Sequence, residues 1–155
     1  MEGLPRKTAS LRLEPAGPAD RDWAAELVRA NMGQDYRRHG LAWDPAAFAA
    51  DWAAGENLLL WLAGEPVGYL RLHHGEGRCY LQDLQVVAGR RGQGLGSRAL
   101  ERIIALSRDR GQRALRLKAF ADSPAIRLYR RHGFVELMQS PPLIGMECRT
   151  PHKEP

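Results

Sequence analysis

The chain has 155 residues, a length typical of one domain, and we expect a single domain over residues 1–155 with loose tails at 1–10 and 150–155. Its 44% hydrophobic and 26% charged residues are close to the averages of soluble globular proteins and exclude a disordered or fibrous chain. The net charge is +5, no apolar stretch approaches the ~18 residues of a membrane span, and two cysteines exclude a disulfide framework. We therefore expect a cytoplasmic protein with no membrane partner and no metal.

The first third of the chain is predicted to be mainly helical. Pro18 suits the start of a helix and Gly33 its end, while Asp44 followed by Pro45 is a cap-and-start signal. The predicted elements are, in order, a strand at Leu11–Leu13, a helix at Pro18–Met32, a polar and aromatic connection at Gln34–Trp43, and a second helix between Asp44 and Gly55.

The remainder changes from strands in series to alternating strands and helices. We predict strands at Asn57–Ala63, Pro66–His74 and Arg78–Val87, with turns at Gly64-Glu65 and Gly75-Glu76-Gly77. There follow a helix from Leu95 to about Arg110, a strand at Ala114–Phe120, a helix from Ser123-Pro124 to Arg131, and strands at Phe134–Met138 and Leu143–Cys148. This order predicts an α/β fold with a mixed, mostly antiparallel central sheet flanked by helices on both faces.

Positive charge is concentrated in one part of the chain. Between Gly89 and Arg131 there are twelve basic residues against three acidic ones, a charge of +9, and the rest of the chain carries −4. A polyanionic ligand fits this asymmetry. No helix-turn-helix, zinc finger, RNP motif or aromatic stacking stripe accompanies it, so we do not expect a nucleic-acid partner.

A glycine-rich turn lies at the start of this basic segment, between a predicted strand and a predicted helix. Its sequence, Arg90-Arg91-Gly92-Gln93-Gly94-Leu95-Gly96-Ser97, combines bare backbone with two arginines. Glycines allow N–H groups to approach an anion closely, and the first turn of a helix adds unpaired donors and the positive end of its dipole. We predict a phosphate site here, although the glycines could also serve only to permit a tight turn.

Two other glycine motifs compete for this turn. A P-loop requires a lysine that is absent here. The dinucleotide fingerprint matches in Gly94, Gly96 and Ala99, but in that fold the first glycine follows its strand almost immediately, whereas here six residues intervene. The hairpins before the turn also differ from the crossover helices that a dinucleotide fold requires.

The turn and a second motif together resemble the GCN5-related N-acetyltransferases (GNAT). Arg91-Gly92-Gln93-Gly94-Leu95-Gly96 matches the family signature (Gln/Arg)-x-x-Gly-x-(Gly/Ala), and the stretch from Ala125 through Tyr129 to Gly133-Phe134 matches Ala-x-x-x-Tyr-x-x-x-Gly-Phe. The resemblance extends from about Asn57 to Phe134. It implies a GNAT-like sheet, acetyl coenzyme A as co-substrate and transfer of its acetyl group to a primary amine.

The resemblance also assigns the coenzyme-binding residues. The pyrophosphate is expected on the turn and the pantetheine arm along the strand before it, where that strand diverges from Ala114–Phe120. Asp122 stands where the family frequently has an asparagine near the cofactor, although it could simply belong to the turn before Ser123. The expected cofactor-binding set is Leu84, Val86, Val87, Arg91, Gly92, Gln93, Gly94, Leu95, Gly96, Ser97 and Asp122.

Two catalytic roles follow by the same comparison. Tyr129 matches the tyrosine that donates a proton to the departing sulfur, and a phenol is protonated at neutral pH; its alternative role is packing. A backbone N–H around Val86 or Val87 would stabilise the oxyanion. Related sequences commonly carry glutamate where Gln82 stands, so the base is open among the neighbouring Asp83, acting through water, and His73 or His74.

The acceptor is identified only as a primary amine of a small molecule, peptide or protein. Tyr36 and His39, with Gln82, are the expected substrate-binding residues, because acceptor loops of the family lie in this connection; the aromatic side chains could instead anchor the loop. A non-catalytic acyl coenzyme A binding module and a dinucleotide-binding protein remain alternatives. The oligomeric state is open, a homodimer included.

Overall fold

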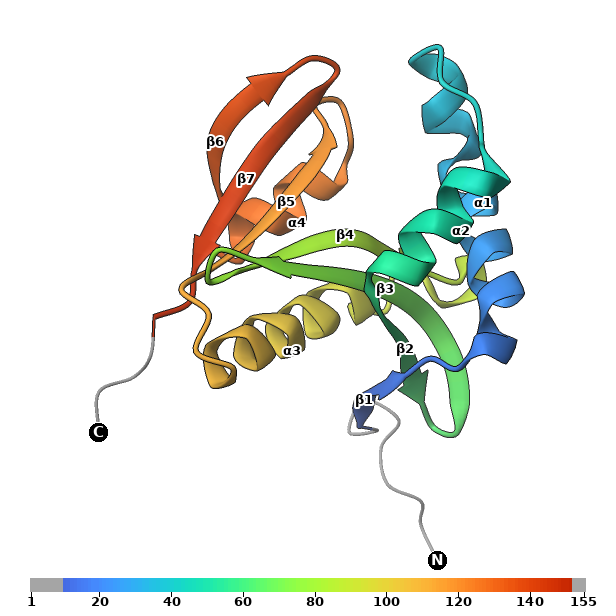
Figure 1. Ribbon diagram of the computed structural model, residues 1–155, viewed down its shortest axis with the longest axis horizontal. Coiled ribbons are helices and arrows are strands. Elements are labelled where there is room, and N and C mark those ends of the chain that lie inside the picture. Colours follow the sequence, from blue (N-terminus) through green and yellow to red (C-terminus); the bar gives the residue numbers. More distant parts are fainter. Residues whose placement is uncertain (1–9, 152–155) are drawn as a thin grey trace, which may run out of the picture.

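The computed structural model describes residues 10–151, and Figure 1 shows their arrangement. The helices are α1 (Arg21–Arg38), α2 (Pro45–Ala54), α3 (Leu95–Asp109) and α4 (Ala125–Arg131). The strands are β1 (Leu11–Pro15), β2 (Glu56–Leu62), β3 (Glu65–Gly75), β4 (Arg78–Val86), β5 (Ala114–Phe120), β6 (Val135–Ser140) and β7 (Leu143–Arg149). Short 3₁₀ turns precede α1 at Pro18–Asp20 and follow β4 at Ala88–Arg90.

The strands form one seven-stranded sheet in the order β1-β2-β3-β4-β5-β7-β6. Every neighbouring pair is antiparallel except β4 and β5, which are parallel. The register of that parallel pair covers only Arg78–Leu81 against Ala114–Leu117, so the carboxyl-terminal parts of both strands diverge. This opening in the middle of the sheet positions the candidate site (Figure 1).

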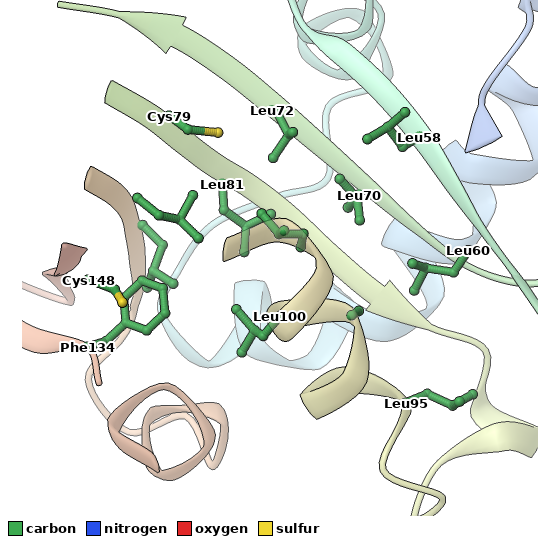
Figure 2. Packing of buried hydrophobic residues seen from close by; sticks show 14 of the residues in the cluster. Leu58, Leu60, Leu70, Leu72, Cys79, Leu81, Leu95, Leu100, Phe134 and Cys148 are labelled. Atoms are coloured by element: carbon green, nitrogen blue, oxygen red, sulfur yellow. The ribbon is translucent and has the colours of Figure 1, made fainter. Parts of the chain in front are cut away.

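Each face of the sheet carries its own hydrophobic cluster. On one face, α3 and α4 pack Leu100, Ile103 and Ile126 against strand residues that include Leu70 and Leu72, as Figure 2 shows for part of this cluster. On the opposite face, α1 and α2 pack a second cluster of Ala24, Val28, Phe48, Leu59 and Tyr69. Successive side chains of a strand point to opposite faces, which places Tyr69 and Leu70 in different clusters. The predicted α/β class, mostly antiparallel sheet and flanking helices are confirmed.

The predicted end of the first helix is wrong. Gly33 lies inside α1, which continues to Arg38 and ends where Gly40 adopts a positive φ of 72°. There the Leu41 N–H donates to the Tyr36 carbonyl at 2.7 Å, closing the helix. Left-handed backbone is the usual signal for a helix end, and Gly40, not Gly33, provides it. Residues 34–38, expected in a connection, are therefore helical.

Smaller shifts occur at the hairpin turns and at the C-terminus. The two-residue turns are Ala63-Gly64 and Glu76-Gly77, all four with positive φ, one residue earlier than predicted for the first. Thr150 is fully buried, and its hydroxyl donates to the Gln112 carbonyl at 2.7 Å, so the loose C-terminal segment does not begin there. The rest of the predicted tails, residues 1–9 and 152–155, lies outside the described residues.

A charged cluster joins β2, β3 and the end of α3. Both Arg110 Nη atoms donate to the Glu56 carboxylate, at 2.7 and 2.8 Å, and His74 Nε2 lies 2.7 Å from Glu56 Oε1. The Arg110 hydrogen bonds lower the pKa of Glu56 to about 2, with a further contribution from His74. A carboxylate with a depressed pKa stabilises the folded state above its unfolded pKa, and this contribution disappears as the pH falls from about 4.5 through about 2.

We predict that Glu56→Gln lowers the free energy of unfolding by about 1–2 kcal/mol at neutral pH, because it removes a bidentate, partly buried ion pair. The deficit relative to the unsubstituted protein should shrink as the pH falls below about 4. Urea unfolding at several pH values measures it. The matched control is Glu76→Gln, which removes a far more exposed partner of Arg78 and should change stability by less than ~0.5 kcal/mol. Equal losses in both variants would contradict the prediction.

Candidate active site

A cavity of about 770 Å³ lies where β4 and β5 diverge. Its walls come from α1 and α2 on one side, from β3, β4 and β5 in the centre, and from α4 and the segment before β7 on the other side. Its lining includes the predicted site residues Tyr36, Gln82, Asp83, Leu84 and Tyr129. The divergence of two strands, predicted from the resemblance, therefore brings residues distant in sequence around one space.

The glycine turn follows β4 after the short 3₁₀ turn at Ala88–Arg90, and it leads into α3. Gly92 and Gly94 have φ of 77° and 74°, and a Cβ added at either would meet no atom within 4 Å. The first intrahelical bond runs from the Arg98 N–H to the Gly94 carbonyl at 3.0 Å, so the N–H groups of Gly94 through Ser97 precede the helical ladder. Open space beside unpaired donors at the positive end of a 15-residue helix fits a phosphate group.

The side chains around the turn have different roles. The Leu95 side chain is buried in the core, which leaves only its backbone for ligand contact. Ser97 Oγ lies 2.6 Å from Nε2 of His132, the C-cap residue of α4. Arg91 and Arg90 point to different partners: Arg91 Nη2 donates to Asn31 Oδ1 at 2.6 Å, and Arg90 Nη2 donates to Glu65 Oε2 at 2.9 Å.

Asp83 is the carboxylate that β4 contributes to the cavity wall, with 13% of its side chain exposed. Arg71 Nη1 lies 3.0 Å from one carboxylate oxygen, and Gln85 Nε2 donates to the other at 3.1 Å. Burial raises the pKa of Asp83, while Arg71 and the hydrogen bond from Gln85 oppose that rise. A carboxylate with a raised pKa is a stronger base and is better suited to accept a proton from an amine.

Tyr129 reaches the same cavity from α4, on the opposite side of the sheet opening. Its ring packs edge to face against Phe134 with centroids 5.8 Å apart, and its hydroxyl makes no hydrogen bond within residues 10–151. Burial raises the pKa of Tyr129 to about 12, and the negative charge of Asp83 contributes. The phenol is therefore protonated at neutral pH and available to donate.

The backbone at the end of β4 restricts the choice of an oxyanion donor. The Val87 N–H donates to the Val67 carbonyl at 2.9 Å and is therefore engaged within the protein. Of the two predicted positions, this leaves Val86, whose carbonyl accepts from Asn31 Nδ2 at 3.0 Å.

Asp122 and His39 form a bridge between α1 and the segment after β5. Arg38 Nε donates to Asp122 Oδ2 at 2.9 Å, and His39 Nε2 lies 3.1 Å from Asp122 Oδ1. These contacts lower the pKa of Asp122. The His39 ring also stacks on Phe120 at a centroid distance of 4.4 Å. Neither His39 nor Asp122 is in the cavity lining, and the two side chains contact each other.

Several polar residues at the site were missed by the sequence reasoning. Arg71 is only 5% exposed yet carries a charge, and a charged residue within the apolar strand β3 was an available signal. Gln85 follows Asp83 at strand spacing and therefore shares its face. Asn31 has no such signal. His73 and His74, the alternative bases, lie outside the cavity lining, at the far end of β3.

Comparisons with known proteins agree with this geometry. The family model described as the acetyltransferase (GNAT) family matches residues 29–134. The ribosomal-protein-S18-alanine N-acetyltransferase of Escherichia coli has a similar structure, with a TM-score of 0.73 and 21% identity over 94% of this chain and 97% of that chain. An acetyltransferase of Thermus thermophilus gives 0.73 and 25% identity over 90% and 97%.

A coenzyme complex is also among the similar structures. The PaiA N-acetyltransferase of Thermoplasma acidophilum, solved with coenzyme A, gives a TM-score of 0.72 and 13% identity over 90% of this chain and 99% of that chain. No curated protein sequence matches significantly. Within residues 10–151, no helix has the length and apolar character to cross a membrane, and no three His, Cys, Asp or Glu side chains are grouped to hold a metal ion.

Proposed function

The chain belongs to the acetyltransferase (GNAT) family, and we propose that it transfers the acetyl group of acetyl coenzyme A to a primary amine of a small molecule or peptide. The observation that carries the proposal is the opening between β4 and β5, where Asp83 and Tyr129 border one cavity and the connection from β4 to α3 contains the glycine turn. The turn would hold the pyrophosphate through the N–H groups of residues 92–97, and the basic segment would attract the polyanion.

The reaction requires one group that accepts a proton and one that donates a proton. A neutral amine attacks the thioester carbonyl, and the tetrahedral oxyanion collapses with loss of the coenzyme A thiolate. In our proposal Asp83 takes the proton from the amine, Val86 N–H stabilises the oxyanion and Tyr129 protonates the sulfur. The raised pKa of Asp83 supports its role as the base, and the raised pKa of Tyr129 means that its phenol carries a proton at neutral pH.

The charge of the cavity supports a cationic acceptor. Asp35, Asp44, Asp51 and Asp83 are among its lining residues, against Arg71 and Lys118. Peptide N-termini, lysine side chains, polyamines and small amines such as aminoglycosides share this chemistry. Cys79 and Cys148 are both free thiols, which agrees with a reducing compartment, the cytoplasm, as the place of action.

One observation favours a second candidate, a non-catalytic acyl coenzyme A binding module. Arg71 lies 3.0 Å from Asp83 and 3.7 Å from Asp51, and a carboxylate paired with a guanidinium is a weaker base. Acetyl transfer is the favoured function because the phenol of Tyr129 makes no hydrogen bond within residues 10–151, whereas a binding module has no use for a proton donor that lines the same cavity as the carboxylate.

Two measurements test the proposal. Coenzyme A should raise the melting temperature, because a ligand that binds only the folded state stabilises it, and a nicotinamide dinucleotide should not. Acetyl coenzyme A with a panel of peptides, polyamines and small amines should then release free thiol with at least one acceptor. Stabilisation without thiol release for any acceptor would favour the binding module, and stabilisation by the dinucleotide alone would overturn coenzyme A binding.

A further inference from the structure

Four polar side chains form an unbroken series of hydrogen bonds from the glycine turn to the cavity. Arg91 Nη2 donates to Asn31 Oδ1 at 2.6 Å, and Asn31 Nδ2 donates to Gln85 Oε1 at 3.1 Å. Gln85 Nε2 in turn donates to Asp83 Oδ1 at 3.1 Å. The residues come from the turn, α1 and β4, so the series joins parts of the chain up to 60 residues apart. We call it the relay.

The relay has one direction. Each amide accepts on the side of the arginine and donates on the side of the carboxylate, so all three bonds point from the positive charge of Arg91 to the negative charge of Asp83. Hydrogen bonds aligned in series polarise and strengthen one another. Gln85 is only 8% exposed, so a reversed amide would place its oxygen against the Asp83 carboxylate with little water to relieve the repulsion.

Asn31 holds this direction. Its Nδ2 also donates to the Val86 carbonyl at 3.0 Å, and Arg91 occupies its oxygen, so both ends of its amide are assigned. We propose, building on the proposed acetyl transfer, that Asn31 is a positioning residue that orients Gln85 toward Asp83 and makes that arrangement depend on Arg91 at the coenzyme turn.

Asp83 faces other ionisable groups that the relay does not include. Arg71 on β3 lies 3.0 Å from its carboxylate, and Asp51 on α2, Tyr36 on α1 and Tyr129 on α4 interact with it electrostatically. None of them is altered by a substitution at Asn31 or Arg91. A change in the proton affinity of Asp83 in such variants therefore reports on the relay.

The first test is the pH profile of kcat/KM for an acceptor identified by thiol release. Asn31→Ala frees Gln85, and the loss of a donor to the carboxylate should move the acidic limb upward by about one pH unit. Asn31→Asp should move it further, because its second oxygen forces the Gln85 amide to reverse. An Asn31→Ala variant that changes KM but leaves the limb unmoved would overturn the proposal.

A matched pair of arginine variants tests the relay without a substitution at Asn31, and therefore still applies if the Asn31 variants do not fold. Arg91→Gln and Arg90→Gln remove the same charge from neighbouring positions, but only Arg91 contacts the relay. Arg91→Gln should move the acidic limb upward and Arg90→Gln should move it less than half as far. Equal movement by both variants would show a long-range charge effect and contradict the relay.

The second test does not depend on catalysis. Coenzyme A dissociation constants measured by calorimetry for Arg91→Gln, Asp83→Asn and the double variant should depart from additivity by about threefold or more. The non-additivity should vanish when Asn31→Ala is also present, and the Arg90→Gln cycle should be additive. If no acceptor gives thiol release, the acetyl-transfer proposal is wrong, and this cycle still tests the relay. If the enzyme is active but the Arg91 and Asp83 effects on the coenzyme A dissociation constant are additive, only the relay is wrong.

Discussion

Gly94→Asp is expected to weaken coenzyme A binding by about a hundredfold or more. The substitution places a carboxylate beside the N–H groups of residues 94–97, where an anionic ligand would bind. The carboxylate repels the pyrophosphate and occupies donors that it needs, and the loss of two charge-assisted hydrogen bonds is worth about 3 kcal/mol. Calorimetry, or the melting-temperature rise caused by coenzyme A, measures the loss.

Two variants separate charge from backbone strain. Gly94→Asn has nearly the same volume without the charge, and asparagine tolerates the φ of 74° at this position better than most residues, so binding should fall by less than about tenfold. Gly64→Asp places the same side chain in another open turn, at a φ of 83° between β2 and β3, and should leave coenzyme affinity unchanged. If Gly94→Asp and Gly94→Asn had equal affinities for coenzyme A, pyrophosphate binding at this turn would be contradicted.

The strands and the central helix could be predicted because their signals are local. The two hairpins are specified by turn residues beside β-forming runs, and α3 by Leu95, Ala99 and Ile103 on one face. The glycine turn was identifiable for the same reason, because neighbouring residues in the sequence indicate both its backbone freedom and its position between a strand and a helix. Local signals were weaker at α1, where either of two glycines could end the helix and Gly40, not Gly33, adopts the positive φ.

The site was only partly predictable because its geometry depends on long-range contacts. Asp83 was recognisable from its place in β4, but its environment comes from Arg71 on the neighbouring strand and from Gln85, held by Asn31 from α1. The bridge of Asp122 to Arg38 and His39 joins residues more than 80 positions apart. No spacing rule connects such residues, since their proximity arises from the packing of α1 over the sheet.

Tyr129→Phe is expected to lower kcat by about a hundredfold to a thousandfold while changing the coenzyme A dissociation constant by less than about threefold. The ring remains, with its edge-to-face contact to Phe134 at 5.8 Å, and no hydrogen bond within residues 10–151 is lost with the hydroxyl. The departing thiolate must then leave without a proton from the enzyme. Steady-state kinetics with the identified acceptor, beside calorimetry with coenzyme A, measure both quantities.

The pH dependence and a second tyrosine make this expectation specific. A phenol with its pKa raised to about 12 is protonated throughout the range from about pH 6 to 9, so the factor lost in Tyr129→Phe should be nearly constant there. Tyr80→Phe removes a hydroxyl from the paired part of β4, opposite Arg116 and outside the cavity lining, and should retain turnover. If Tyr129→Phe turned over as fast as Tyr80→Phe, the proton would have to reach the sulfur from water, and Tyr129 would be a packing residue.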